Sequence, residues 1–191
     1  MWSISVFSTG VEKLKLAGAC DIVMSCLRPR IPPQTPDDAR VVNAGLAVIL
    51  NMSYYKSAGA DKDKSAAAGK ELDNVEACRL ALSCLAKNAI ASDAGVIYIA
   101  LRALEVIADR NTEATKQLVA ADACKLVLAC LREHEDDEKI ASQVLRVMKM
   151  LLENKTAIAQ LHSAGAVTTI ADISTTFCMG AGIFNAALLC I

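Results

Sequence analysis

The chain has 191 residues, of which 54% are hydrophobic and only 4% are aromatic. Its 20 basic and 21 acidic residues give a formal net charge of −1, so it lacks the basic surface that nucleic-acid binding needs. The first residues have no basic region followed by a long apolar core, and no apolar run reaches the roughly 18 residues of a membrane span. We therefore expect a cytoplasmic protein that binds neither nucleic acid nor membrane.

Three segments repeat the same pair of cysteines followed by a leucine, at residues 20–27, 78–85 and 124–131. A fourth segment, residues 167–174, keeps the frame with Val167 and Ile173 in place of the cysteines. Self-similarity at a regular spacing indicates a tandem repeat. Because aliphatic residues replace the cysteines in the fourth segment, we expect the paired cysteines to be buried, reduced and packed as small hydrophobic side chains.

The eight cysteines do not have the spacing of a disulfide framework or a metal site. Residues six apart on a helix do not face each other. No Cys-x-x-Cys motif occurs, and His134 and His162 lack the spacing of metal ligands. We therefore predict no metal, no cofactor and a reducing compartment.

Each repeat is predicted to contain three helices. A short first helix ends at an anchor leucine; the four anchors are Leu14, Leu72, Leu118 and Leu161. A bend marked by Gly18 or Gly165 leads to a second helix with the cysteine pair, and a polar loop leads to a longer third helix. The third helices are predicted at residues 43–53, 98–110, 142–154 and 185–191.

Side chains that cap helix N-termini mark the starts of several helices. Asn111 and Asn154 are predicted to cap two of the first helices. Asp37, Ser92 and Asp136 are predicted to cap three of the third helices.

We predict an all-α fold, a right-handed α-solenoid of about four repeats. One repeat cannot bury its own apolar faces, whereas stacked repeats share a continuous core. The predicted repeats cover residues 7–53, 65–110, 111–153 and 154–191, and residues 54–64 form an insert loop. The last repeat ends in an apolar pattern that no later repeat covers, so we expect a longer solenoid or self-association through the C-terminal end.

The order of a short helix, an Ala-Gly-Ala bend, an apolar second helix, a polar loop and a longer third helix resembles the armadillo-repeat family. The bend occurs within residues 16–23 and 161–167. The third-helix ending at residues 49–52, Ile-Leu-Asn-Met, is similar to the family's Leu-x-Asn-Leu. The resemblance covers about residues 5–191, and HEAT repeats are the nearest alternative.

This resemblance implies a non-enzymatic scaffold whose third helices line a concave groove that binds a partner protein or peptide. In peptide-binding members such as importin alpha, an asparagine lies on the groove, one turn after a tryptophan. The asparagine position corresponds here to Asn51, Val106 and Met150, and the tryptophan position to Ala47, Arg102 and Arg146. One turn earlier lie Tyr98 and Ser142, with Asn43 and Asn185 in the same row. Since only Asn51 keeps the family residue, we do not expect an asparagine ladder of the nuclear-import type.

Arg102 and Arg146 occupy the same turn of successive third helices. Paired guanidinium groups suit carboxylates or phosphates, so the resemblance implies an acidic or phosphorylated partner segment. The alternative is a solvated helix surface with local salt bridges, because Glu105 and Lys149 are close in sequence.

The segment Arg30-x-x-Pro33-x-x-Pro36 has the form of a ligand for domains that bind polyproline II helices. A stiff loop between two helices is the simpler interpretation. We find no phosphate-binding loop, nucleophile elbow or His-Glu-x-x-His motif in the sequence, so we do not expect an enzyme. The alternatives to a scaffold are a self-associating structural fragment of a longer solenoid and a thiol-based redox sensor.

Overall fold

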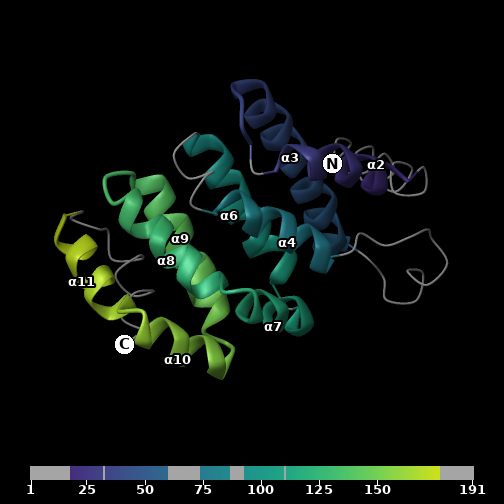
Figure 1. Cartoon of the computed structure of the whole chain (residues 1–191). Coiled ribbons are helices and arrows are strands. Elements are labelled where there is room, and N and C mark those ends of the chain that lie inside the picture. Colours follow the sequence, from purple (N-terminus) through teal and green to yellow (C-terminus); the bar gives the residue numbers. More distant parts are fainter. Residues whose placement is uncertain (1–17, 32, 60–73, 87–92, 110, 177–191) are drawn as a thin grey trace.

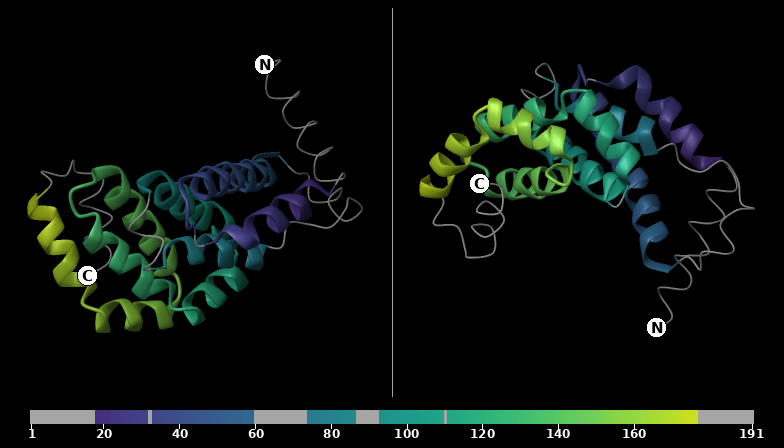
Figure 2. Two further views of the ribbon diagram at one scale, coloured as in Figure 1. Left: turned by 45° about the horizontal axis from the view of Figure 1, so that its top comes forward. Right: turned by 90° about the horizontal axis from the view of Figure 1, so that it is seen from below.

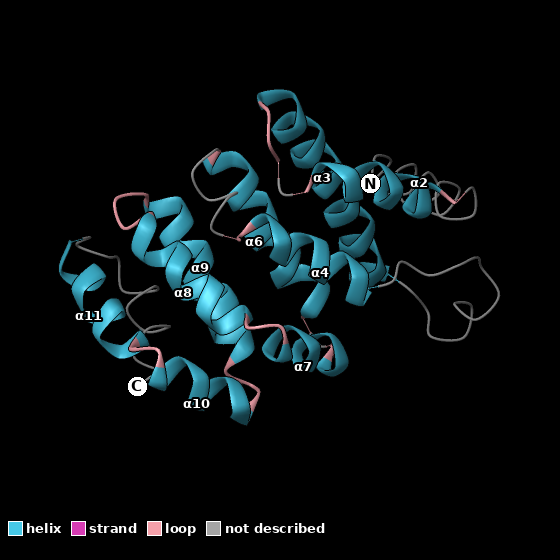
Figure 3. Ribbon diagram, in the orientation of Figure 1, coloured by secondary structure: helices cyan, strands magenta, loops and turns pink. Residues whose placement is uncertain are grey.

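The computed structural model describes residues 18–31, 33–59, 74–86, 93–109 and 111–176 (Figure 1). Within these residues the chain forms nine α-helices and one short 3₁₀ helix, and no strand (Figure 3). The predicted all-α class is therefore confirmed for the described part of the chain. None of the described helices combines the length and apolar character needed to cross a membrane.

The helices follow the predicted order of short, cysteine-bearing and longer segments. The predicted second helices are α2 (Ala19–Leu27), α4 (Asn74–Cys84), α8 (Ala123–Glu133) and α11 (Ala166–Thr176). The predicted third helices are α3 (Pro36–Gly59), α6 (Ala94–Ala108) and α9 (Glu138–Leu151). Two predicted first helices are α7 (Thr112–Ala120) and α10 (Lys155–Ser163), and the 3₁₀ helix η1 (Arg28–Arg30) follows α2. The predicted helix at 185–191 lies outside the described residues.

Capping side chains begin at least five of the described helices, and the sequence bears directly on four of these caps. Asn111 accepts a hydrogen bond from a main-chain N–H of α7, and Asn154 does the same for α10, as predicted. The caps of α6 and α9 are Asp93 and Asp137, each one residue after the predicted position. In both places two neighbouring residues can cap, and the backbone turn decides which one does.

Helix α3 is longer than predicted at both ends. Its N-terminus is a capping box in which the Asp38 N–H donates to Thr35 Oγ1 at 3.1 Å and the Thr35 N–H donates to Asp38 Oδ2 at 3.2 Å. The predicted cap at Asp37 was therefore wrong. Residues 54–59, predicted as part of a loop, continue the helix because no helix-stopping residue occurs before Gly59. Residues 60–64 lie outside the described part.

The bends that precede the second helices use left-handed backbone. Gly18 and Gly165 have φ values of 73° and 78°, as their bend positions required. Asp122 holds the equivalent position with a φ of 60°, which aspartate tolerates better than most residues. Glu76, the fourth equivalent residue, lies inside α4, so this bend differs.

The helices form a curved array with α2 and α11 at opposite ends (Figure 2). Helix α6 lies near the middle and packs against α3, α4 and α9. The buried side chains form one continuous cluster that runs from Met24 on α2 to Ile173 on α11. The small aliphatic residues that dominate the composition let the helices approach closely within this core.

Four of the paired cysteines are buried free thiols, as predicted: Cys78, Cys84, Cys124 and Cys130. Cys26 is exposed, so the prediction was wrong for this residue. The neighbouring helices explain the difference, because α7 packs against α4 and α10 against α8, whereas among the described helices α2 packs closely only on α3 and η1. The Cys20 side chain and residues 178 and 190 lie outside the described part.

An arginine that follows the cysteine pair links successive segments at two places. Arg132 donates from Nε to Thr169 Oγ1 at 3.0 Å and from Nη2 to the Ala164 carbonyl oxygen at 2.9 Å. Arg28, which holds the equivalent position after α2, donates from Nε to Glu76 Oε1 at 3.1 Å. Both arginines thus reach the bend position of the next segment.

Replacing Arg132 with alanine is expected to lower the free energy of unfolding by about 1–2 kcal/mol, because it removes two hydrogen bonds from a charged donor. Urea denaturation measures this loss. Arg79→Ala on α4 is the matched control, since Arg79 is exposed there, and its effect is expected to stay within about 0.5 kcal/mol. Equal losses from the two variants would contradict a specific role for the Arg132 contacts.

Candidate functional site

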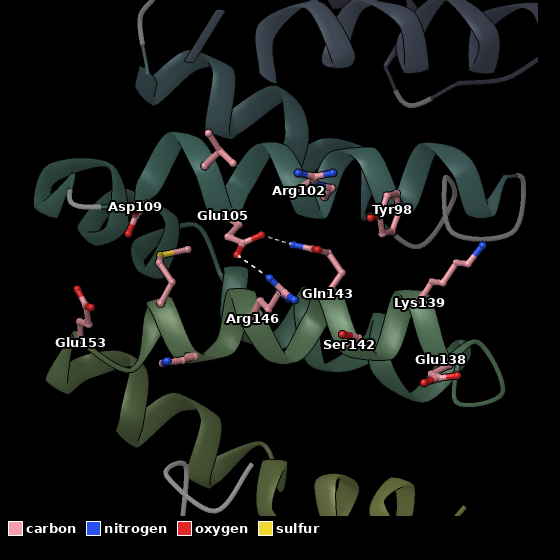
Figure 4. A pocket seen from close by; sticks show the side chains of 13 residues that line it. Tyr98, Arg102, Glu105, Asp109, Glu138, Lys139, Ser142, Gln143, Arg146 and Glu153 are labelled. Atoms are coloured by element: carbon pink, nitrogen blue, oxygen red, sulfur yellow. Dashed lines mark hydrogen bonds and ion pairs between the residues drawn. The ribbon is translucent and has the colours of Figure 1, made fainter. Parts of the chain in front are cut away.

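A groove with a volume of about 980 Å³ lies between α6 and α9 (Figure 4). We refer to it as the α6–α9 groove. The α6 side is lined by Tyr98, Arg102, Glu105, Val106 and Asp109. The α9 side is lined by Glu138, Lys139, Ser142, Gln143, Arg146, Lys149, Met150 and Glu153.

The period of the helix explains why these residues share one surface. On α6, Ile97, Leu101 and Leu104 are fully buried and face the core. The residues at positions 98, 102, 105 and 109 recur at spacings of three and four, on a neighbouring stripe about 100° around the helix from the buried one. Equivalent positions on α9 form a second stripe, and the two helices run parallel in Figure 4. The groove therefore forms where the corresponding stripes of α6 and α9 lie side by side.

Six of the ten residues predicted from the family resemblance line this groove: Tyr98, Arg102, Val106, Ser142, Arg146 and Met150. The three predicted residues on α3 are not among the lining residues. Asn51 is exposed, and Ala47 is half-buried. Asn43 lies against the start of α6, because a β-carbon added to Gly95 would be 3.3 Å from the Nδ2 atom of Asn43. Asn185 lies outside the described part.

Glu105 connects the two sides of the groove. Its Oε2 accepts a hydrogen bond of 2.6 Å from Nε2 of Gln143, a side chain that is only 5% exposed. Its Oε1 lies 4.0 Å from Nη1 of Arg146. Arg146 therefore forms a salt bridge, as one interpretation of the sequence predicted, but its partner Glu105 lies on the other helix of the groove.

Arg102 differs from Arg146, because its guanidinium has no hydrogen-bond or ion-pair partner within the described residues. It is half-buried and lies on α6 between Tyr98 and Glu105 in Figure 4. A guanidinium in this position has unused donors that an incoming carboxylate or phosphate can accept from.

Sequence reasoning missed seven lining residues, most of them charged. With them included, the groove has four basic residues, Arg102, Lys139, Arg146 and Lys149, and four acidic residues, Glu105, Asp109, Glu138 and Glu153. The sequence could have indicated them, because residues three and four positions away from Arg102 and Arg146 lie on the same helix face as these arginines. The groove is consequently balanced in charge, whereas the two arginines alone implied a basic surface.

The cysteines that are buried are unsuited to nucleophilic chemistry. Burial raises the pKa of Cys84 and of Cys130 to about 12, and Glu133 adds to the effect on Cys130. Burial also raises the pKa of Cys124 to about 11. Since the thiolate is the reactive form, these thiols react slowly at neutral pH. None of them lines the groove, and the described residues contain no cluster that could hold a metal ion.

The proline-rich segment is occupied by contacts within the chain. Arg30 donates from Nη1 to the Cys26 carbonyl oxygen at 2.8 Å, and its Nε lies 3.8 Å from Asp38 Oδ1. Pro33 is buried, and Pro36 is the first residue of α3. The segment therefore does not present the exposed, extended face that a polyproline II ligand needs.

Comparisons of the chain with protein-family models, with curated proteins and with solved structures found no match. A functional proposal rests on the geometry of the α6–α9 groove.

Proposed function

We propose that the chain is a right-handed α-solenoid of about four armadillo-like repeats and that it acts as a non-enzymatic scaffold. In this proposal an extended segment of a partner protein binds in the α6–α9 groove. The recurring helix order supports the repeat, as do the left-handed residues at equivalent bends. The contacts of Arg28 and Arg132 add support, because they reach equivalent parts of the next segment, Glu76 for Arg28 and Ala164 beside the Gly165 bend for Arg132.

The observation that carries the binding proposal is the pairing of Arg102 and Arg146 on facing turns of one groove, with Arg102 unpaired among the described residues. Arg146 already faces the Glu105 carboxylate at 4.0 Å, so an incoming carboxylate or phosphate would accept chiefly from Arg102. Pockets for small molecules are mostly apolar with a few polar groups. Eight charged side chains line this groove, which favours a charged polypeptide segment over a small apolar ligand.

The structure bears on one of the two alternatives, the thiol-based redox sensor. A thiol-based redox sensor needs an accessible thiol of low pKa, whereas burial raises the pKa of Cys84, Cys124 and Cys130. Self-association was predicted through residues 179–191, which lie outside the described part. Light scattering of the full chain measures that alternative directly.

Charge reversal in Arg102→Glu is expected to weaken binding about tenfold while leaving the melting temperature unchanged, because the side chain takes no part in the core. Peptides selected from a displayed library against the full chain serve as probes, and fluorescence anisotropy measures their affinity. Added salt is expected to weaken the same binding. Arg79→Glu, a reversal at an exposed position of α4, is the control. If both variants lose affinity equally, the groove is not the binding site.

A further inference from the structure

Glu105 places a negative charge inside the α6–α9 groove, next to the arginine that the proposed function uses. It follows Arg102 by three residues on α6, so the two side chains share one face of the helix. Across the groove, Oε1 of Glu105 lies 4.0 Å from Nη1 of Arg146 (Figure 4). An acidic partner segment that reaches Arg102 therefore also approaches the carboxylate of Glu105.

A hydrogen bond holds this carboxylate in the groove. Nε2 of Gln143 donates to Oε2 of Glu105 at 2.6 Å, and the Gln143 side chain is only 5% exposed. If Glu105 turned away, the buried amide would lose its acceptor, and a buried donor without an acceptor is costly. Glu105 consequently cannot withdraw from an incoming anion without the loss of this bond.

The charge of Glu105 is only partly compensated by its neighbours. The side chain of Glu105 is 29% exposed, and partly buried charges are screened less by salt than exposed ones. Arg146 is 65% exposed, and the 4.0 Å separation is too long for a hydrogen bond, so this ion pair is weak. Like charges brought together at an interface lower affinity and exclude wrong partners.

We propose that Glu105 sets the charge specificity of the groove by lowering its affinity for acidic segments. In the unmodified chain Arg102 attracts an acidic side chain, and Glu105 opposes it. The groove thus favours a weakly acidic segment over a strongly acidic one. Without the charge at position 105, both Arg102 and Arg146 are available to the same anion. This inference rests on the proposed function and specifies the chemistry of the partner.

The variant Glu105→Gln tests the inference, because it removes the charge and keeps an oxygen that can accept from Gln143. The probes are two synthetic twelve-residue peptides in one otherwise uncharged host sequence. The acidic peptide carries Glu-Glu at its centre, and the amide peptide carries Gln-Gln. Fluorescence anisotropy with the full chain is expected to show that Glu105→Gln binds the acidic peptide about fivefold tighter and the amide peptide with unchanged affinity.

Two variants with the same change of net charge are the controls. Glu138 also lines the groove, but it is the first residue of α9, eight residues before Arg146. Eight residues of helix span about 12 Å, which exceeds the distance over which physiological salt screens exposed charges. Glu138→Gln is therefore expected to change the affinity for the acidic peptide less than twofold. Glu113→Gln, at an exposed position of α7, is expected to leave it unchanged.

The outcomes separate this inference from the proposed function. If Glu105→Gln does not change the affinity for the acidic peptide, while Arg102→Glu weakens it, the inference is overturned and the proposed groove stands. An equal gain for both peptides would also overturn the inference, because the variant would then open the groove rather than remove a repulsion. Equal gains from Glu105→Gln and Glu138→Gln would assign the effect to overall charge and overturn it as well. If binding of the acidic peptide does not depend on Arg102, the proposed function fails together with the inference.

Discussion

Raising the pH from 8 to 10 is expected to lower the free energy of unfolding by about 3 kcal/mol through two buried thiols, Cys84 and Cys130. Burial raises the pKa of each from 9.0 to about 12. Both side chains are 0% exposed in the core, so no water stabilises a thiolate there.

The direction follows from proton binding in the two states. Between pH 9.0 and about 12 the unfolded thiols lose their protons, whereas the folded thiols keep them. The unfolded state then binds fewer protons than the folded state, and stability falls as the pH rises through this window. Well below pH 9.0 both states hold these protons, so the two thiols make stability independent of pH there.

Urea denaturation at a series of pH values measures the slope. The control is the double variant Cys84→Ala/Cys130→Ala, which is expected to be less stable at pH 8 by on the order of 1–3 kcal/mol per site, because each replacement leaves a cavity. Its stability is expected to fall less between pH 8 and 10. The same slope in both proteins would contradict the assignment of the pH effect to these thiols.

Features fixed by the repeat could be predicted from the sequence. Cys84 and Cys130 occupy a position that holds Ile173 in the fourth segment, and all three side chains are buried. Gly18 and Gly165 mark bends because only a residue that tolerates positive φ fits there. These predictions succeeded because each depends on local backbone and on a pattern that recurs in the same chain.

Features that depend on neighbouring helices could not be predicted from the sequence. Cys26 has the same local sequence position as Cys130, but it is exposed, and among the described helices α2 packs closely only on α3 and η1. Glu105 and Gln143 meet across two helices, so their 2.6 Å hydrogen bond depends on how closely α6 and α9 approach. Periodicity places each residue on a helix face, but it does not specify which side chain of the next helix it meets.

Helix α6 is the element on which the largest loss of stability is expected. It packs against α3, α4 and α9, and it also provides one wall of the α6–α9 groove. Ile97, next to Tyr98 of the groove, is 0% exposed. Because α6 is enclosed by three helices, the surrounding backbone has little freedom to collapse into a cavity at this position.

Replacing Ile97 with alanine is expected to lower the free energy of unfolding by about 2–5 kcal/mol, the sum of lost hydrophobic transfer energy and the cavity left behind. Ile158→Ala on α10 is the matched control, since Ile158 is 48% exposed, and its loss is expected to stay below about 1 kcal/mol.

If the chain is the proposed solenoid, contacts run only between neighbouring repeats, so weakening α6 should also uncouple α2 and α3 from α8 and α9. Hydrogen exchange is then expected to give different opening free energies for the helices before α6, α2 and α3, and for the helices after it, α8 and α9. Equal losses in the two variants would contradict the packing around Ile97, and uniform exchange across the helices would contradict the solenoid.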